Sequence, residues 1–385
     1  MTSMPPDVLQ IGARWFPEVH AGLERYYYDL TRHLPAAGFN VRGLVLAQSS
    51  PRVAPGLEIT AYARPDTFIG KRVWQLRRAA QASLNTRRVS LIGCHYALYG
   101  FPISDIMNTI PTVFHFHGPW SAEGQMERNS LPARWTKRYI EQSLYRRPVA
   151  FVVLSQAFGE TLRRTYGIPE ERIFVIPGGV DIARFETDLD QKASRRALGF
   201  DEARPLVVTI RRLVHRVGIE NLIDGIADVV KKVPDVLLAI GGTGPLEQEI
   251  RDQIEQRNLA RNVRLLGSVP EEHLPLVYRA ADISIVPSIA LEGFGLTTLE
   301  SLACGTPVLV TPVGGLPEVV RDLSPDLVLS GKAAPALAQG LIAFFNGTLR
   351  LPDAAACAVY TRQRFGWPTI ARRVANLYAK VLANG

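Results

Sequence analysis

The sequence has few cysteines and no long apolar run. The three cysteines, Cys94, Cys304 and Cys357, are odd in number and far apart, and they form no metal-ligand spacing. This pattern excludes a disulfide framework and predicts buried, reduced thiols in a cytosolic protein. No stretch approaches the ~18 consecutive apolar residues of a membrane-spanning helix. The opening segment, MTSMPPDVLQIGARWFPEVH, lacks a basic part followed by an apolar part, so we expect no secretory signal.

Several signatures of metal and nucleophile chemistry are missing as well. No Asp-x-Asp follows a predicted strand; Asp188 and Asp190 form such a pair, but in a polar stretch where a solvated loop is expected. A divalent cation on a diphosphate is therefore not indicated. The sequence also lacks zinc-ligand spacing, a Walker loop and a Gly-x-Ser-x-Gly elbow. We expect no metal and no cofactor.

The net charge of +8 is concentrated in the first half of the chain. Residues 1–184 contain 22 Lys and Arg against 14 Asp and Glu, whereas the remainder is balanced. The cations cluster between residues 71 and 88 and again between 134 and 147. Such a bias favours docking on an anionic surface such as membrane lipid, although a merely solvated basic face fits equally well. No stacking-aromatic motif accompanies the cations, so we expect no nucleic acid.

The chain has 385 residues, 47% of them hydrophobic and 21% charged, which suits a globular protein too long for one core. Apolar runs of strand length alternate with amphipathic segments of helix length, which predicts an α/β fold with parallel sheets. The strands expected in the first half are 8–13, 41–47, 89–95, 111–117, 149–155 and 173–181. Those expected in the second half are 206–211, 236–242, 263–267, 283–288, 307–312 and 327–330.

A polar stretch between these two series, residues 183–205, lacks strand character. We therefore predict two Rossmann-like domains, 1–184 and 185–366, followed by an amphipathic helix in 367–385. Ligands bind beyond the carboxyl ends of parallel strands. Two such sheets facing each other would form one deep cleft, with the donor held by one domain and the acceptor by the other.

The most specific segment is Glu292-Gly-Phe-Gly-Leu-Thr-Thr-Leu-Glu300, which follows the strand at 283–288 and opens an apolar-periodic helix. Gly293 and Gly295 allow a tight turn that exposes amides at the helix N-terminus, where the helix dipole favours a diphosphate. Glu292 can accept hydrogen bonds from sugar hydroxyls. Glu300 lies about two helical turns further on, where a carboxylate can hold both hydroxyls of a ribose. The alternative is a capped helix with two surface glutamates.

This segment, with the downstream Ala-x-Gly-Thr-Pro-Val and Gly-Gly-x-x-Glu patterns, resembles the GT-B glycosyltransferases of family 4. The resemblance implies a retaining reaction and a second domain that binds a nucleotide-sugar such as a UDP-hexose or GDP-mannose. It implies that Glu292 contacts the donor sugar and Glu300 the ribose. The donor-binding turn then consists of Phe294, Gly295 and Leu296, whose amides contact the distal phosphate and sugar, and of Thr297.

A group of cations follows the strand at 206–211. The family shows Gly-Arg-Leu and then Lys-Gly, whose Arg and Lys clamp the diphosphate and stabilise the charge that develops on it. Here Arg212 matches the arginine, Arg211 replaces the glycine and Val217 stands at the lysine position. The resemblance makes Arg212 a catalytic residue. Arg216 or Arg211 is expected to supply the second cation, and surface salt bridging is the alternative for these extra arginines.

The segment His115-Phe-His-Gly-Pro-Trp120 ends the strand at 111–117, and alternation places His115 and His117 on the same side of it. His117 resembles the histidine of the family's His-Gly pair, which points at the donor sugar across the cleft. We assign His117 to the catalytic site, with a sugar-positioning and electrostatic role, and expect His115 to be a core histidine. Trp120 and Glu123, in the following loop, are candidates for the acceptor or sugar pocket.

The loop after the first strand, Phe16-Pro-Glu-Val-His-Ala-Gly-Leu-Glu24, resembles the family's Pro-x-x-Gly-Gly-x-Glu loop, which approaches the phosphates and the acceptor. Gly22 keeps one glycine of that loop, Ala21 replaces the other, and Glu24 is expected to anchor the loop. By the same resemblance Gly242 belongs to the backbone wall of the nucleotide pocket, and the final helix crosses back to the first domain.

These features predict a metal-independent, retaining hexosyltransferase. The expected donor is an NDP-sugar, with UDP-hexose favoured, and the expected acceptor is a glycan or lipid-linked glycan in cell-surface polysaccharide biosynthesis. The excess of cations in residues 1–184 and the resemblance to the family predict a cytoplasmic protein that is peripheral on the cytoplasmic face of a membrane. The alternatives are a GT-B-like nucleotide-sugar epimerase or inverting transferase, and a nucleotide-sugar-binding protein without turnover, since Val217 and Ala21 depart from the family pattern.

Overall fold

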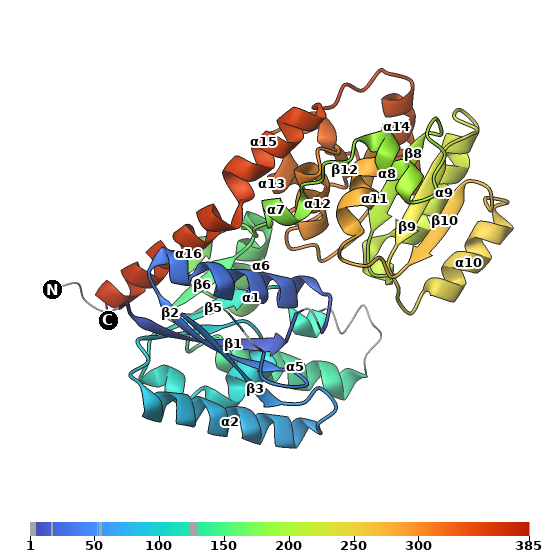
Figure 1. The fold of residues 1–385 in the computed structure, drawn as a ribbon. Coiled ribbons are helices and arrows are strands. Elements are labelled where there is room, and N and C mark those ends of the chain that lie inside the picture. Colours follow the sequence, from blue (N-terminus) through green and yellow to red (C-terminus); the bar gives the residue numbers. More distant parts are fainter. Residues whose placement is uncertain (1–4, 17, 52, 54–55, 123–129, 385) are drawn as a thin grey trace. The chain divides into compact units, whose positions relative to one another are not determined.

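The computed structural model describes residues 5–16, 18–51, 53, 56–122 and 130–384, and the chain forms two compact units (Figure 1). Unit 1 comprises Met1–Gly179 and Trp367–Gly385, and unit 2 comprises Val180–Gly366. The boundary predicted between residues 184 and 185 lies a few residues after this division. The polar stretch 183–205 belongs to unit 2, where α7 (Ile182–Phe185) and α8 (Gln191–Ala197) pack against α11 (Leu274–Ala280).

Unit 1 is built on a seven-stranded sheet in the order β3-β2-β1-β4-β5-β6-β7, and every neighbouring pair is parallel. Most of its strands are buried on both faces, which explains why they read as near-continuous apolar runs. The strands are β1 (Asp7–Arg14), β2 (Asn40–Leu46), β3 (Leu57–Ala63), β4 (Leu91–Cys94), β5 (Thr112–Phe116), β6 (Ala150–Val153) and β7 (Ile173–Val175).

Helices cover both faces of this sheet. α1 (Gly22–His33) and α16 (Trp367–Ala383) lie on one face, and α2 (Ile69–Thr86) and α5 (Leu131–Leu144) lie on the other (Figure 1). The 3-10 helix η2 (Phe101–Ile103) contacts both α2 and α5. The other helical segments of this unit are η1 (Pro35–Ala37), α3 (Ala97–Gly100), η3 (Ile106–Asn108), α6 (Gln156–Tyr166) and η4 (Glu170–Arg172).

Helix α16 is tied to unit 1 by its buried face. Trp367, Ile370, Val374 and Tyr378 recur every three or four residues and are buried, and α16 packs against α1. A Cβ atom at Gly179 would lie 2.7 Å from the Trp367 ring, so the indole packs directly on the backbone there. The helix thus returns to unit 1, as predicted.

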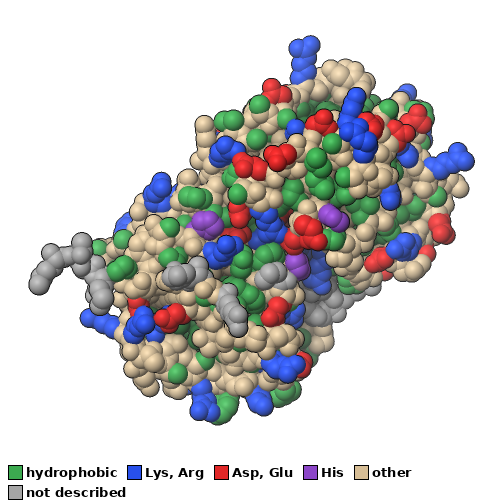
Figure 2. Space-filling model, viewed as in Figure 1, with side chains coloured by type: hydrophobic (Ala, Val, Ile, Leu, Met, Phe, Trp, Pro, Cys, Tyr) green, Lys and Arg blue, Asp and Glu red, His purple; other side chains and the backbone are tan. Residues whose placement is uncertain are grey.

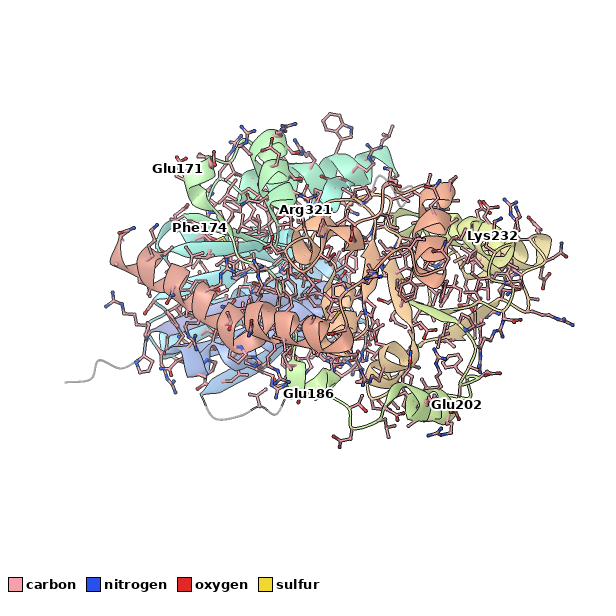
Figure 3. All side chains as sticks on the ribbon, turned by 90° about the horizontal axis from the view of Figure 1, so that it is seen from above. Glu171, Phe174, Glu186, Glu202, Lys232 and Arg321 are labelled. Carbon is pink, nitrogen blue, oxygen red and sulfur yellow. The ribbon has the colours of Figure 1, made fainter. Side chains whose placement is uncertain are left out.

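The same helix also covers the outer edge of the sheet at β7. Arg373 donates a hydrogen bond to the Val175 carbonyl at 3.1 Å, and the Lys380 ammonium lies 5.3 Å from the ring centroid of Phe174, which is labelled in Figure 3. An open strand edge is a template for pairing with another chain. The charged side chains of α16 protect this edge.

Unit 2 contains a five-stranded parallel sheet in the order β10-β9-β8-β11-β12. Its strands are β8 (Leu206–Ile210), β9 (Leu237–Gly241), β10 (Val263–Gly267), β11 (Ile283–Val286) and β12 (Val308–Val310). Besides α7, α8 and α11, its helical segments are η5 (His215–Val217), α9 (Ile219–Val230), α10 (Glu247–Gln256), α12 (Leu296–Ala303), α13 (Leu316–Val320), η6 (Pro325–Leu327), α14 (Ala334–Phe345) and α15 (Ala354–Phe365).

One strand was missed and one predicted strand was wrong. The segment Leu57–Ala63 forms β3, which we did not predict, because this edge strand alternates buried and exposed residues instead of forming an apolar run. The predicted strand 327–330 is not one: its first residue ends η6, and only an isolated bridge joins Val328 to Val310. The sheets therefore have seven and five strands, not six each.

The three cysteines are buried and free, as expected. Burial raises the pKa of the Cys94 and Cys357 thiols to about 12, which keeps them protonated and unreactive near neutral pH. Among the helices in the described part of the chain, none combines the length and the hydrophobicity needed to cross a bilayer.

Candidate functional site

The candidate site of unit 2 lies at the carboxyl ends of β8 and β11. Strand β8 pairs with β9 on one side and with β11 on the other. The strand order therefore changes direction at β8. In open α/β sheets, ligands bind beyond the strand ends at such a switch point. We name this region of unit 2, at the carboxyl ends of β8 and β11, the crevice. Arg211 directly follows β8, and Ser288 and Glu292 follow β11. The topology thus brings together residues that are far apart in the sequence.

Arg211 and Glu292 form a buried ion pair in this crevice, with their side chains 9% and 10% exposed. The guanidinium of Arg211 also donates to the Thr297 hydroxyl at 3.0 Å and to the Ser288 hydroxyl at 3.1 Å. The Ser288 hydroxyl in turn donates to Glu292 Oε2 at 2.8 Å. Arg211 therefore links the end of β8 to both ends of the Glu292–Thr297 turn.

These contacts keep Glu292 ionised. Burial opposes its ionisation, but the charge of Arg211, the hydrogen bonds from Ser288 and Arg211, and the charge of Arg216 together outweigh it. The pKa of Glu292 is therefore lower than the ordinary value for a glutamate. An ionised carboxylate at this position is an acceptor of hydrogen bonds, as binding of sugar hydroxyls requires.

The turn between Glu292 and α12 has an unusual backbone. Leu291 has a φ of +50°, in the left-handed region that a leucine seldom adopts, and Gly295 has a φ of +81°. The Thr298 amide donates to the Gly295 carbonyl at 2.9 Å. Among the described residues, the amides of Phe294, Gly295 and Leu296 have no acceptor. Three free donors at a helix N-terminus can bind an anion.

Two glycines let neighbouring backbone approach the ion pair. A Cβ atom on Gly242 would lie 1.9 Å from the Arg211 carbonyl oxygen, and one on Gly314 would lie 1.9 Å from the Glu292 carbonyl oxygen. Neither position has room for a side chain, because the obstacle is backbone. Gly242 thus forms part of a backbone wall, and the wall packs on Arg211.

The structure places the other arginines differently. The side chain of Arg212, our predicted catalytic cation, is exposed, and it forms no hydrogen bond or ion pair within the described part of the chain. Arg216 is partly exposed and close enough to lower the pKa of Glu292. Val217, at the lysine position of the family, is buried in the core of unit 2. Arg211 is therefore the cation that the structure joins to Glu292.

Glu300 lies on the buried side of α12, 6% exposed, and accepts a hydrogen bond from the Tyr278 hydroxyl at 3.2 Å. The predicted ribose contact thus has a tyrosine partner on α11. Phe294 points into the same unit, where its ring packs against Phe365 at 5.9 Å. The alternative of two surface glutamates is wrong, because Glu292 and Glu300 are both buried.

In unit 1, His117 belongs to a chain of polar contacts inside the sheet. Its Nε2 atom lies 3.3 Å from Nδ1 of His95, and His95 Nε2 donates to the Gln10 side-chain oxygen at 2.8 Å. Gln10 then donates from Nε2 to the Tyr378 hydroxyl at 2.9 Å. Because Gln10 presents an oxygen to His95, the proton of His95 is on Nε2. Its Nδ1 therefore accepts from His117.

His115 continues this chain in the core. Its ring stacks on His95 at 4.3 Å, and its nitrogens lie 2.7 Å from the Tyr378 hydroxyl and 3.2 Å from the Tyr26 hydroxyl. His115 is fully satisfied and buried, as expected for a core histidine. His117 is partly exposed at the end of the chain of contacts.

Burial keeps all three histidines neutral. It lowers the pKa of His117 to about 3 and takes those of His95 and His115 well below the ordinary value, the latter two with help from neighbouring histidines. A neutral His117 that donates inward from Nε2 presents Nδ1 as an acceptor. It can therefore receive a hydrogen bond from a sugar hydroxyl.

The loop residues are described in part. Gly22 is the exposed first residue of α1 and follows Ala21 at the helix N-cap. Burial raises the pKa of Glu24 in the same turn. Trp120 packs against Tyr96 and lies under the Lys137 ammonium. Pro17 and Glu123 lie outside the described residues.

Asp190, which belongs to the Asp-x-Asp pair, caps α8: its carboxylate accepts from the Ala193 amide at 2.7 Å. This is a structural role at a helix N-terminus. Within the described ranges, no group of three or more potential ligands is arranged to hold a metal ion.

Sequence reasoning missed Ser288, Gln10, His95 and Tyr378. Ser288 ends the predicted strand 283–288, so its place beside Glu292 was open to inference. Gln10 is a lone polar residue in an apolar run, and that is a sequence signal of a buried polar contact. Nothing local indicates that His95 and Tyr378 join it, because their meeting depends on sheet order and on the return of α16.

Two family models match the chain. Residues 20–184 match "Glycosyltransferase Family 4", and residues 190–364 match "Glycosyl transferases group 1". A D-inositol 3-phosphate glycosyltransferase of Corynebacterium efficiens is 30% identical over 349 residues, which cover 86% of this chain and 82% of the relative. A GDP-mannose-dependent phosphatidylinositol monomannoside mannosyltransferase of Corynebacterium glutamicum is 31% identical over 211 residues, which cover 52% of this chain and 55% of the relative.

Solved structures share the fold over nearly the whole chain. Sucrose-phosphate synthase of Thermosynechococcus elongatus has a TM-score of 0.83 at 22% identity, covering 99% of this chain and 100% of the other. HepE of Anabaena, solved with UDP and glucose, has a TM-score of 0.76 at 21% identity, covering 97% and 100%. These neighbours have the GT-B fold. The chain therefore belongs to the family 4, group 1 glycosyltransferases and has their GT-B fold, with two parallel-sheet α/β domains.

Proposed function

We propose that this glycosyltransferase moves a hexosyl group, with retention and without a metal ion, from an NDP-sugar to a glycan or lipid-linked acceptor in cell-surface polysaccharide biosynthesis. One observation carries the donor part of the proposal. The crevice at β8 and β11 combines an ionised, buried Glu292 with free amides at the N-terminus of α12. This pair of features fits a ligand that has hydroxyls next to a diphosphate.

In this proposal the amides of Phe294, Gly295 and Leu296 bind the distal phosphate, and Glu292 accepts from the sugar hydroxyls. The acceptor oxygen attacks the anomeric carbon on the face from which the diphosphate leaves. The bond from that carbon to the phosphate oxygen breaks, and the acceptor proton passes to this oxygen. Arg211, Arg216 and Arg212 are the cations available to stabilise the departing charge.

We favour a UDP-hexose as the donor. HepE, a structural neighbour, was solved with UDP-glucose, whereas the corynebacterial mannosyltransferase relative is named for GDP-mannose. A thermal-shift panel of UDP, GDP, ADP and their sugars tests this choice. Stabilisation by GDP compounds alone would mean that the donor carries guanine and not uracil. No stabilisation by any of these compounds would refute the donor site.

The stereochemistry and the metal independence have direct tests. The anomeric configuration of the product, read by proton NMR before mutarotation, should equal that of the donor. Transfer should continue in excess EDTA, because the helix amides and arginines take the role of a cation at the diphosphate. An inverted product, or activity restored only by Mg²⁺ or Mn²⁺, would overturn these parts.

A donor-binding protein without turnover is the second candidate, because Val217 is buried where the family has its lysine. Titration calorimetry with UDP-glucose, combined with an assay of donor hydrolysis and transfer, separates the two. Binding without any release of UDP would favour this second candidate.

For the location, we propose the cytoplasmic face of an anionic membrane, where a lipid-linked acceptor is presented. The charge excess of residues 1–184 supports this location.

A further inference from the structure

Unit 1 exposes an unusual set of apolar side chains. Ten large hydrophobic side chains are exposed in the described part of the chain, and seven of them belong to α2, η2, α5 and the residue before α2. Surface apolar residues are normal when scattered, but a contiguous group marks an interaction site. We name this group the docking face; it consists of Phe68, Ile69, Trp74, Phe101, Leu131, Trp135 and Tyr139.

The pattern on α5 is clearest. Leu131, Trp135 and Tyr139 are four residues apart and therefore lie on one side of the helix. They are 65%, 75% and 64% exposed, while Glu141 and Leu144 are buried on the other side. A helix that covers a sheet normally directs polar residues toward solvent. This helix presents a row of apolar and aromatic side chains instead.

Helix α2 and η2 extend the row into a face. Trp74 is exposed on α2, with the Arg78 guanidinium 4.7 Å from its ring centroid. η2 contacts both helices, and its Phe101 packs against Tyr139 of α5 with ring centroids 6.4 Å apart. Helices α2 and α5 lie on the same face of the sheet (Figure 1), so the exposed side chains that they present belong to that side.

Unpaired cations accompany these side chains. Arg77 of α2 is paired with Asp105, but within the described ranges no other Lys or Arg of α2 and α5 forms an ion pair with a carboxylate. Figure 2 shows Lys and Arg side chains beside hydrophobic ones along the lower margin of the molecule, where α2 lies. Besides Arg77, the cations on the two helices are Lys71, Arg72, Arg78, Arg134, Lys137 and Arg138; of these, Arg72 and Arg138 donate to backbone carbonyls.

The position of this face relative to the sheet follows from the topology. α2 and α5 each connect one parallel strand to another, so both run back from the carboxyl edge of the sheet. Phe68, Ile69 and Leu131 lie where these helices begin. The apolar groups are therefore concentrated toward the edge at which His117 also lies.

We propose that the docking face binds the surface of an anionic phospholipid bilayer, with Trp74, Trp135 and Tyr139 in the headgroup layer and the cations on the lipid phosphates. Tryptophan and tyrosine suit an interface because one end of the ring is apolar and the other polar. A second copy of this chain is disfavoured, because it would bring one basic face against another. Aliphatic Ile69 and Leu131 do not stack on nucleic-acid bases.

This inference deepens the proposed location and rests on it for the class of acceptor. It adds an orientation: the carboxyl edge of the unit 1 sheet is held toward the membrane. A lipid-linked acceptor would then reach His117 and Gly22 without leaving the bilayer surface.

The test is sedimentation of the full chain with vesicles of phosphatidylcholine alone or mixed with phosphatidylglycerol. We expect binding to the mixed vesicles. Lys71→Glu combined with Arg78→Glu should weaken it about 25-fold or more, since each cation near the surface contributes roughly fivefold. Trp74→Ser with Trp135→Ser should weaken binding by about tenfold as well. Binding should fall steeply with salt as the Debye length shortens.

Matched controls come from unit 2. Leu189→Ser and Val359→Ser remove exposed hydrophobic side chains outside the docking face and should leave vesicle binding unchanged. Circular dichroism shows whether each variant is folded. Equal loss in these controls, equal binding to neutral vesicles, or a docking-face variant that changes only the oligomeric state would overturn the proposal.

Nucleotide binding distinguishes this inference from the proposed function. The docking-face variants should keep the thermal shift with UDP-sugars, because none of the changed residues belongs to the crevice of unit 2. Vesicle binding without any nucleotide response would refute the donor assignment alone. A nucleotide response in a chain that ignores anionic vesicles would refute the docking face alone.

Discussion

The ion pair between Arg211 and Glu292 allows a sharp test of the crevice. We consider Arg211→Met, which keeps much of the side-chain volume but removes the charge and three hydrogen bonds, to Thr297, Ser288 and Glu292. The variant leaves the Glu292 carboxylate buried with the Ser288 hydroxyl as its neighbour. Removing one partner of a buried pair costs about 3–5 kcal/mol, because the other charge stays uncompensated.

The pH dependence of this loss has a definite sign. In the wild type the pKa of Glu292 is lowered, so its contribution to stability is present above the unfolded value of ~4.3 and is lost as pH falls through the folded value. In Arg211→Met, burial dominates and the folded pKa rises above the unfolded one. The variant then loses stability as pH increases from ~4.3, so the difference from the wild type is largest at neutral pH.

Hydrogen exchange followed by mass spectrometry measures this effect in each unit. Peptides from β8 and α12 should exchange faster in the variant at pH 7.5, with a difference of about 3 kcal/mol that shrinks toward pH 5. Peptides from β1 in unit 1 serve as the internal control. All five tryptophans belong to unit 1, so their fluorescence follows the unfolding of that unit alone.

A double-mutant cycle completes the test. Glu292→Gln alone leaves Arg211 buried without its carboxylate and should also destabilise unit 2. Arg211→Met combined with Glu292→Gln should cost less than the two single changes together, by about 2 kcal/mol or more. Additive costs, or a variant as protected as the wild type at neutral pH, would refute the assignment of a stabilising buried pair.

Three further predictions follow from the same structure. Gly314→Ala should destabilise unit 2 by roughly 1–3 kcal/mol, measured by urea unfolding, because its Cβ atom would meet the Glu292 carbonyl; Gly347→Ala, with open space around it, controls for the effect of alanine itself. The folded-state pKa values of His95, His115 and His117 are lowered, so unit 1 should lose stability as pH falls below the unfolded value of ~6.5, by about 1.4 kcal/mol per pH unit for each histidine. Tryptophan-detected unfolding should show a shallower slope in His117→Asn, and an unchanged slope would contradict a neutral His117. Asp190→Ala should cost about 1 kcal/mol through loss of the α8 cap, while leaving a metal-free transfer rate unchanged; Asp190→Asn should restore the stability.

Much of this architecture could be predicted because parallel strands buried on two faces produce apolar runs that stand out in the sequence. β3 was missed for the opposite reason. An edge strand with one solvent-exposed face alternates buried and exposed residues, and Leu57–Ala63 contains no long apolar run. The turn from Glu292 to Glu300 was found because its glycines and its place after a strand are local features. The burial of both glutamates needed the structure.

The choice of cation was harder to predict. Arg211 and Arg212 are adjacent, and at the end of a strand neighbouring side chains point to opposite sides. Family spacing favoured Arg212, whereas the structure turns Arg211 toward Glu292 and leaves Arg212 exposed. Which of two adjacent arginines faces the crevice depends on where β8 ends and on the Gly242 backbone beside it. The sequence contains no sign of either.

The return of α16 to unit 1 has a consequence for the order of biosynthesis. Unit 2 is continuous in sequence, but unit 1 needs both Met1–Gly179 and Trp367–Gly385. During translation the first segment leaves the ribosome early, with Gln10 and His115 still lacking Tyr378 and with no indole to cover Gly179. The later unit can complete its core before the earlier one does. Helix α16, which is made after unit 2, thus closes the first domain, and a nascent chain presents a finished histidine network only after α16 has left the ribosome.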